Sequence, residues 1–278
     1  MTERDVKSAV REHYAGLART SAGCCDSASP SGGCCGTTST PVGLSREIGY
    51  SERELGEAPE GSNLGLGCGN PLAHAALGQG DVVVDLGSGA GFDCFLAANR
   101  VGPDGRVIGI DMTPEMLERA RANAVAGGYT NVEFRLGEIE NLPVADGSAD
   151  MVISNCVINL AADKGRVFRE ALRVLKPGGR LMVSDLVLRR PLPESVRRSV
   201  EAYVGCIAGA MLEDDYLAAI RRSGFTEVEL LAEATYPIGA SNPDETEVTL
   251  LNDPALSREE VQAAAKAVVS VKIGARRP

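Results

Sequence analysis

The sequence predicts an α/β fold: a doubly wound, mostly parallel sheet with helices on both faces, a flexible cysteine-rich N-terminal arm and a C-terminal α+β extension. Three observations predict it. From residue 81 onward, short continuous apolar runs alternate with helical stretches, which is typical of parallel strands buried on both faces. Residues 21–41 contain almost no large apolar side chain. After Asp185 the regular alternation ends.

The alternating part of the chain contains five expected strands and three helices. The strands are expected at Val82–Leu86, Arg106–Asp111, Val132–Leu136, Met151–Ser154 and Arg180–Ser184. The helices are expected at Gly91–Val101, Glu115–Ala126 and Gly165–Leu175. Pro114 in the first turn, with Thr113 before it as the cap, marks the start of the second helix. Strands that alternate with helices predict parallel pairing.

The two ends of the chain show weaker patterns. An N-terminal amphipathic helix is expected, rather than a secretory leader, from the spacing of Val6, Val10, Tyr14 and Leu17. Toward the other end we expect helices at Pro193–Ala210, Asp214–Ser223 and Arg258–Ala267, a strand at Thr226–Ala232 and an antiparallel edge strand in "VVSVKIGARRP". The expected division is 1–45 for the helix and arm, 46–188 for the ligand-binding sheet and 189–278 for lid helices and the α+β region.

Composition excludes several classes of function. The net charge is −10 and there is no basic block, so a nucleic-acid partner is not expected. No apolar run approaches the roughly 20 residues that a membrane-spanning helix needs. We therefore expect a cytoplasmic protein with no membrane partner, and a monomer is favoured over an oligomer.

Cysteine is the compositional anomaly. There are eight: Cys24, Cys25, Cys34, Cys35, Cys68, Cys94, Cys156 and Cys206. A reducing compartment disfavours a disulfide framework, so metal, metalloid or redox chemistry is the sharper interpretation. Cys94, flanked by apolar residues, is expected to be a buried thiol packed against the sheet. With only two histidines in the chain, there is little room for histidine-based catalysis or zinc ligation.

The junction after the first strand, "VVVDLGSGAGFD", predicts a ligand site. Its glycines allow a tight turn that a ligand can approach closely, and the following helix N-terminus favours an anionic group. Asp111, at the end of the second strand, is placed to accept hydrogen bonds from a ribose diol. A dinucleotide fold uses an acidic residue in the same way, so this feature does not discriminate by itself.

Four motifs in order are more specific: "VVVDLGSGAG", "VIGIDMTPEML", "LGEIENLPVADGSADMVIS" and "VLKPGGRLMVSD". Together they resemble the Rossmann-like methyltransferases that use S-adenosyl-L-methionine as the methyl donor. The resemblance implies that the glycine loop holds the methionine end, that Asp111 holds the ribose, and that Met112 packs on the adenine, although plain core packing is an alternative for Met112. The candidate cofactor-binding residues are Asp85, Gly87, Ser88, Gly89, Gly91, Asp111, Met112, Glu138, Ile139 and Asn155.

Three thiols are expected to converge beside the methyl donor. Cys156 follows the fourth strand at its carboxyl end, where ligands of such sheets lie. In this class of methyltransferase, the regions that contain Cys68 and Cys206 form the lid over the acceptor pocket. Three soft thiolates suit a trivalent, pyramidal centre with a free lone pair, such as arsenite.

The motifs "GSNLGLGCGNP", "GSGAGFDCFLAA", "DMTPEML", "SNCVINL" and "GCIAGA" are similar to those of the arsenite S-adenosylmethionine methyltransferases. The resemblance implies that Cys156 and Cys206 bind arsenic(III), with Cys68 completing the set, and that arsenite and methylarsenite enter as thiol conjugates in a detoxification reaction. It also implies that an N-terminal cysteine forms a disulfide with Cys68, which thioredoxin or glutathione reduces. Cys34 and Cys35 are favoured for this role, although Cys24 and Cys25 compete.

Two other interpretations stay open. The first is a methyltransferase of another small molecule, such as a quinone or a sterol-like carbon. It has no use for the thiols, and the 4% aromatic content offers little of the large apolar pocket that it needs. The second is a non-catalytic metalloid- or zinc-binding protein on the same scaffold. The intact glycine loop and Asp111 argue against it.

Overall fold

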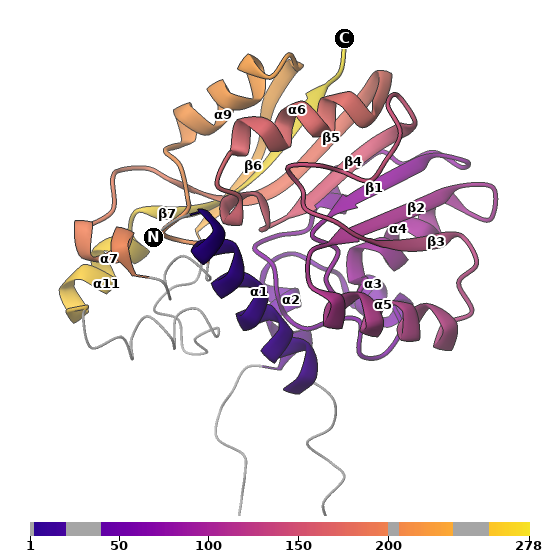
Figure 1. Cartoon of the computed structure of the whole chain (residues 1–278), viewed down its shortest axis with the longest axis horizontal. Helices are drawn as coiled ribbons and strands as arrows, with labels where there is room; N and C mark the ends of the chain where they lie inside the picture. The colour runs from indigo at the N-terminus through magenta and orange to yellow at the C-terminus, as the bar shows by residue number, and fades with distance from the viewer. Residues whose placement is uncertain (1–2, 21–39, 200–205, 236–255) are drawn as a thin grey trace, which may run out of the picture.

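The computed structural model describes residues 3–20, 40–199, 206–235 and 256–278 (Figure 1). At its centre is one seven-stranded sheet with the strand order β3-β2-β1-β4-β5-β7-β6. The strands are β1 (Val82–Leu86), β2 (Arg106–Asp111), β3 (Val132–Leu136), β4 (Ala149–Asn155), β5 (Leu175–Leu188), β6 (Thr226–Thr235) and β7 (Val268–Arg276). The first five pair in parallel, and β7 is antiparallel to both of its neighbours. The predicted doubly wound, mostly parallel sheet is confirmed.

Helices cover both faces of this sheet, as predicted. Their bounds are α1 Glu3–Thr20, α2 Pro41–Glu47, α3 Glu52–Glu57, α4 Phe92–Val101, α5 Pro114–Ala126, α6 Lys164–Val174, α7 Glu194–Arg198, α9 Glu213–Arg222 and α11 Arg258–Ala265, with short 3-10 turns η1 Pro71–Ala73 and η2 Ile158–Leu160. Helices α6 and α9 pack on one face, whereas α4 and α5 pack on the other (Figure 1). Helix α1 packs against α5.

The buried side chains form three clusters. Two of them fill the two faces of the sheet, because the apolar runs of β1 and β4 point alternately to either side. The third lies at the carboxyl end of the sheet and joins α1, α7 and α11 to the ends of β5 and β7. Both Cys68 and Cys206 belong to this third cluster. A small apolar core therefore surrounds these two thiols.

Two predictions for the C-terminal region were wrong. The final strand, β7, is not an edge strand: it lies between β5 and β6. Its side chains do alternate, with Val269, Val271 and Ile273 buried on one face, but alternation shows only that one face is apolar and not how many neighbours a strand has. The expected helix Pro193–Ala210 is not continuous. Helix α7 ends at Arg198, since Ser199 is extended, and Cys206 begins a turn in the left-handed region with φ +63°.

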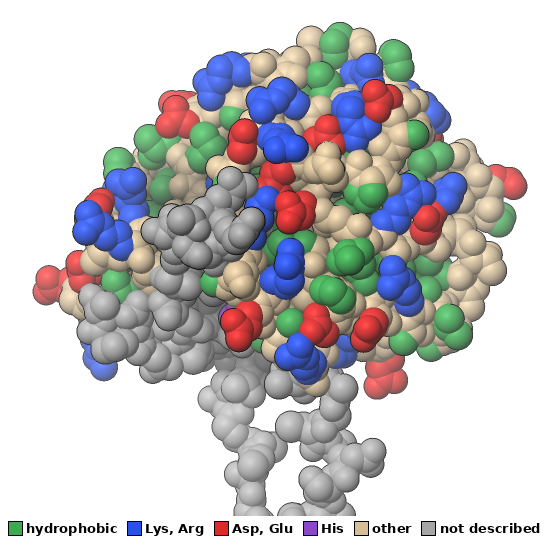
Figure 2. All heavy atoms as spheres, viewed as in Figure 1, with side chains coloured by type: hydrophobic (Ala, Val, Ile, Leu, Met, Phe, Trp, Pro, Cys, Tyr) green, Lys and Arg blue, Asp and Glu red, His purple; other side chains and the backbone are tan. Residues whose placement is uncertain are grey.

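Two local features also bear on the predictions. Thr113 is the N-cap residue of α5, as expected, but its side chain makes no capping hydrogen bond. The Thr113 hydroxyl instead bonds to Asp111. Within the described ranges, none of the helices combines the length and the apolar character needed to cross a membrane. On the face shown in Figure 2, basic and acidic side chains are interspersed.

Candidate functional site

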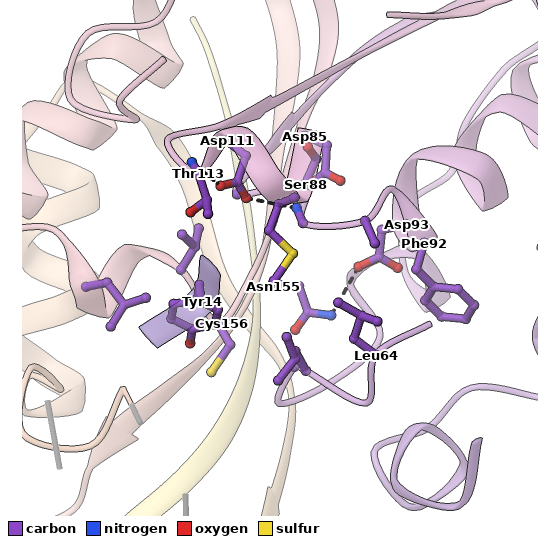
Figure 3. Close-up of a pocket in the computed structure, with 18 of the residues that line it drawn as sticks. Tyr14, Leu64, Asp85, Ser88, Phe92, Asp93, Asp111, Thr113, Asn155 and Cys156 are labelled. Atoms are coloured by element: carbon purple, nitrogen blue, oxygen red, sulfur yellow. Dashed lines mark hydrogen bonds between the residues drawn. The ribbon is translucent and has the colours of Figure 1, made fainter. Parts of the chain in front are cut away.

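The site lies at the carboxyl ends of the parallel strands, where the strand order reverses. β1 pairs with β2 on one side and with β4 on the other, so the loops that follow these strands leave the sheet in opposite directions. Between them is a cavity of about 210 Å³. Its walls include the loop after β1, the end of β2, the end of β4 and helix α1 (Figure 3).

The loop after β1 is shaped by close backbone contacts. The amides of Gly87 and Ser88 both donate to the Ile110 carbonyl, at 2.8 and 3.0 Å. Gly87 has φ +70°, and a Cβ on it would lie 2.5 Å from the Val157 side chain, so only glycine fits. A Cβ on Gly89 would meet nothing within 4 Å. The loop thus leaves its backbone open to the cavity.

Asp111 joins this loop to α5. Its carboxylate accepts hydrogen bonds from the amides of Gly89 and Thr113, at 2.9 and 2.8 Å. Burial raises the pKa of Asp111, although these bonds favour the ionised form. Each carboxylate oxygen has a second lone pair. The Thr113 hydroxyl and the Met112 amide also bond to this carboxylate, so a ligand hydroxyl would share Asp111 with them while the bond to the loop is kept.

Two further polar atoms on the cavity wall lack partners. The Ser88 hydroxyl and the Asn63 Nδ2 are both buried, and neither makes a hydrogen bond among the described residues. A buried polar atom without a partner is costly, so these two are expected to bind a polar ligand. Asn63 was not predicted, since its segment contains only an irregular, glycine-rich pattern.

Cys156 and Cys206 both line the cavity. Cys206 Sγ donates to the Cys156 carbonyl at 2.8 Å. In the described part of the chain, only three non-glycine residues have a positive φ, and two of them are these cysteines, at +57° and +63°. Such conformations are unfavourable for residues with a Cβ and tend to occur at functional sites.

Cys68 lies close to Cys156 but does not line the cavity. It is 1% exposed, and its sulfur, the Cys156 sulfur and an Asp185 carboxylate oxygen all lie within 4.8 Å of one another. Hydrogen bonding to Cys206 and Cys68 raises the pKa of Cys156 well above its usual value, and burial raises that of Cys68. Cys68 and Cys156 are therefore protonated at neutral pH.

Asn155 ties the Cys68 loop to the end of β4. Its carboxamide accepts from the Cys68 amide at 3.1 Å and donates to the Gly69 carbonyl at 2.8 Å. Nδ2 also contacts Tyr50 Oη at 2.9 Å. Its contact with Asp93, at 3.1 Å, is drawn in Figure 3. Tyr50 Oη in turn donates to Asp93 at 2.7 Å. Although Asn155 lines the cavity, its hydrogen bonds hold the thiol loop in place.

Helix α1 closes one side of the cavity. Tyr14 lies beside Cys156 (Figure 3), and its hydroxyl shares a hydrogen bond with Cys206. Burial first, and then the neighbouring thiols, raise the pKa of Tyr14 well above its usual value. Lys7 pairs with Glu138 at 2.8 Å and with Glu140 at 3.1 Å. The sequence revealed α1 only as an amphipathic helix, without indicating what its Tyr14 would face.

The predicted site residues divide into three groups. Those that line the cavity are Asp85, Gly87, Ser88, Gly89, Asp111, Met112, Ile139, Asn155, Cys156 and Cys206. Those that lie beside it are Gly91, which caps α4, Glu138, which pairs with Lys7, and Cys68. Cys34 and Cys35, with Cys24 and Cys25, lie outside the described residues. Cys94, expected to be a packed thiol, is fully buried and contacts Asp85 at 3.1 Å.

Similarity to known proteins agrees with this geometry. Residues 77–233 match the family described as "Methyltransferase domain". The chain is 49% identical over 229 residues to an arsenite methyltransferase of Halobacterium salinarum, a match that covers 81% of this chain and 59% of that protein. It is 46% identical over 182 residues to an arsenite methyltransferase of Aquipseudomonas alcaligenes, covering 63% of this chain and 52% of that one. The matched region thus spans little more than half the length of these curated relatives.

A solved structure is similar over most of the chain. It is that of CrArsM, an arsenic(III) S-adenosylmethionine methyltransferase from Chlamydomonas reinhardtii, with a TM-score of 0.63 and 35% identity. The match covers 84% of this chain and 73% of that one.

Proposed function

The chain belongs to the methyltransferase domain family and, within it, to the arsenic(III) methyltransferases, and we propose that it transfers methyl groups from S-adenosyl-L-methionine to trivalent arsenic. One observation carries the proposal. Cys156 and Cys206 line the same cavity as the glycine loop and Asp111, and the Cys68 sulfur lies within 4.8 Å of the Cys156 sulfur. A methyl donor and a thiol-bound acceptor would therefore share one enclosed space.

The cavity fits the donor chemically. The loop from Gly87 to Gly89 would face its amino-acid end, and the unpartnered Ser88 hydroxyl and Asn63 amide offer hydrogen bonds to polar groups. Asp111 would accept from the ribose hydroxyls. When bound, S-adenosyl-L-methionine supplies an electrophilic methyl group on a sulfonium.

Arsenic loading requires no general base. Each exchange of a protonated thiol, as at Cys68 and Cys156, breaks one S–H and one As–O bond and forms one As–S bond and one water molecule. The arsenic lone pair then attacks the methyl group without losing a proton. The three sulfurs would hold arsenic beside the donor, and such positioning contributes on the order of 7–11 kcal/mol to catalysis.

Methyl transfer uses the arsenic lone pair and so raises arsenic from the +3 to the +5 state. Two electrons must return before another methyl group is added. We propose that Cys68 and an N-terminal cysteine, Cys34 or Cys35, supply them by forming a disulfide, which thioredoxin or glutathione then reduces by thiol–disulfide exchange. Methylarsenite held by thiols would be the next acceptor.

Product analysis tests the proposal. The reduced protein is incubated with arsenite and S-adenosyl-L-methionine, and the arsenic species are separated by chromatography. Cys156→Ser is compared with Cys94→Ser, which changes a thiol in the core. Methylated arsenic from the wild type and Cys94→Ser, but not from Cys156→Ser, is expected. Absence of methylated arsenic from a wild type that still binds the donor would show that the acceptor is another molecule.

A further inference from the structure

Asp185 is a buried carboxylate that the proposed methyl transfer does not use. It is 0% exposed, yet one of its oxygens lies within 4.8 Å of the sulfurs of both Cys68 and Cys156. From this arrangement we propose that Cys68, Cys156 and Asp185 form a binding site for one zinc ion. The ligand set differs from that of arsenic, which would take sulfur from Cys206 instead of oxygen from Asp185.

The distances suit a tetrahedral ion. Zinc binds sulfur at about 2.3 Å and carboxylate oxygen at about 2.0–2.2 Å, which places neighbouring ligand atoms about 3.5–3.8 Å apart. Because the three atoms lie within 4.8 Å of one another, they need to approach by no more than about 1 Å, which a small rotation of two cysteine side chains provides. The fourth position is left for water from the cavity, which Cys156 lines.

The carboxylate of Asp185 is already oriented. It accepts hydrogen bonds from Asn159 Nδ2 at 2.9 Å, from the Leu186 amide at 2.9 Å and from the Tyr216 hydroxyl at 2.8 Å. Protein metal sites hold their ligating carboxylates by such outer hydrogen bonds. Two of these bonds end on Oδ1 and one on Oδ2, so they fix the direction of the carboxylate and leave one lone pair, on Oδ2, for a metal.

Two ammonium groups balance the charge of the site. Lys164 acts electrostatically on Asp185, and Lys272 acts on Cys68. Lys272 also donates to Ser270 at 3.1 Å, and the Ser270 hydroxyl donates to the Cys68 carbonyl, so β7 brings the charge to the thiol loop. On binding, two S–H bonds break, two protons pass to the buffer, and two Zn–S bonds and one Zn–O bond form.

Cys206 distinguishes the two ligand sets. Its sulfur is not a member of the group within 4.8 Å and donates to the Cys156 carbonyl instead. Trivalent arsenic favours three soft sulfurs, whereas zinc also accepts a carboxylate oxygen. Loss of Cys206 should therefore weaken arsenic binding and leave zinc binding intact.

The experiment measures Zn²⁺ binding to the full chain by competition with a chromophoric chelator, without arsenic or methyl donor. All variants carry serine at Cys24, Cys25, Cys34 and Cys35, so that only the cysteines of the described residues contribute. We expect one zinc per chain and a dissociation constant that rises about tenfold or more in Asp185→Asn, Cys68→Ser and Cys156→Ser. Cys206→Ser and the core control Cys94→Ser should bind as the parent does.

X-ray absorption of the zinc-loaded parent is the second measurement, and it should show two sulfur ligands with oxygen completing the shell. If thermal unfolding shows that Asp185→Asn does not fold, this spectrum alone tests whether oxygen completes the ligand set. Unchanged affinity in a folded Asp185→Asn, three sulfur ligands, or no binding at all would overturn the proposal. None of these outcomes depends on methyl transfer, so failure here leaves the proposed function standing.

Discussion

Replacing Asn155 with alanine is expected to free the Cys68 loop from the end of β4. Two hydrogen bonds of the carboxamide fix this loop: it accepts from the Cys68 amide at 3.1 Å and donates to the Gly69 carbonyl at 2.8 Å. Each such bond contributes about 0.5–1.5 kcal/mol, so the loss of both costs about 1–3 kcal/mol. Because the freed loop must be ordered again when arsenic binds, arsenite affinity should fall about 5- to 140-fold.

The assay combines urea denaturation with equilibrium dialysis of arsenite against the reduced protein. Asn131→Ala is the matched control, because Asn131 Nδ2 also donates to two backbone carbonyls, of Ala98 at 3.1 Å and of Gly102 at 2.9 Å, far from the thiols. Both variants should lose stability, Asn155→Ala more because its side chain also contacts Tyr50 and Asp93, whereas only Asn155→Ala should lose arsenite affinity. Equal arsenite affinities in the two variants would refute the role assigned to Asn155.

Three other predictions concern the cofactor side of the cavity. Gly87→Ala should abolish binding of the methyl donor, as measured by calorimetry, because Gly87 has φ +70° and the new Cβ would lie 2.5 Å from the Val157 side chain. Donor binding at wild-type affinity would contradict this geometry of the loop. Burial raises the pKa of Asp93 from 3.8 to about 6, so the folded state keeps a proton that the unfolded state has lost. The stability that this group contributes is therefore present below about pH 4 and lost as the pH rises to about 6. Urea denaturation of the wild type and of Asp93→Asn should show that the difference in their free energies of unfolding falls across that range. A difference that stays constant would contradict the raised pKa of Asp93. Lys7→Met removes the ion pairs with Glu138 and Glu140 that help to hold α1 over the cavity. Donor affinity should therefore fall and its salt dependence should weaken, as calorimetry at two ionic strengths would show. An unchanged affinity would mean that these ion pairs do not help α1 to close the site.

The parallel sheet and the position of the cavity at the carboxyl ends of its strands were predictable because they follow from local patterns. Continuous apolar runs identify buried strands, and the residue after each strand must lie at the same edge of a parallel sheet. Asp111 and Cys156 could therefore be placed beside the glycine loop from the sequence alone. For Cys68 and Cys206, local pattern was not enough, because both lie in irregular segments; only resemblance to other proteins brought them to the site.

Long-range packing accounts for what was missed. Asp185 lies in the motif "VLKPGGRLMVSD", but no residue near it in the chain indicates that it faces Cys68. Asn155 and β7 hold the Cys68 loop beside it. Tyr14 was an apolar position of an amphipathic helix, and its contact with Cys206 depends on how α1 packs. The position of β7 was misjudged because the last segment of a chain can join a sheet at its edge or within it, and its partners lie far away in sequence.

The sequence alone determined the class of fold, the cofactor loop and the presence of a thiol at the end of β4, since these depend on periodicity and on residues within a few positions of one another. Tertiary structure decided which thiols meet, which carboxylate faces them and which helix covers them. Such contacts join segments as distant as Cys68 and Ser270, and their free energy comes from burial and hydrogen bonds that exist only once the whole sheet has formed.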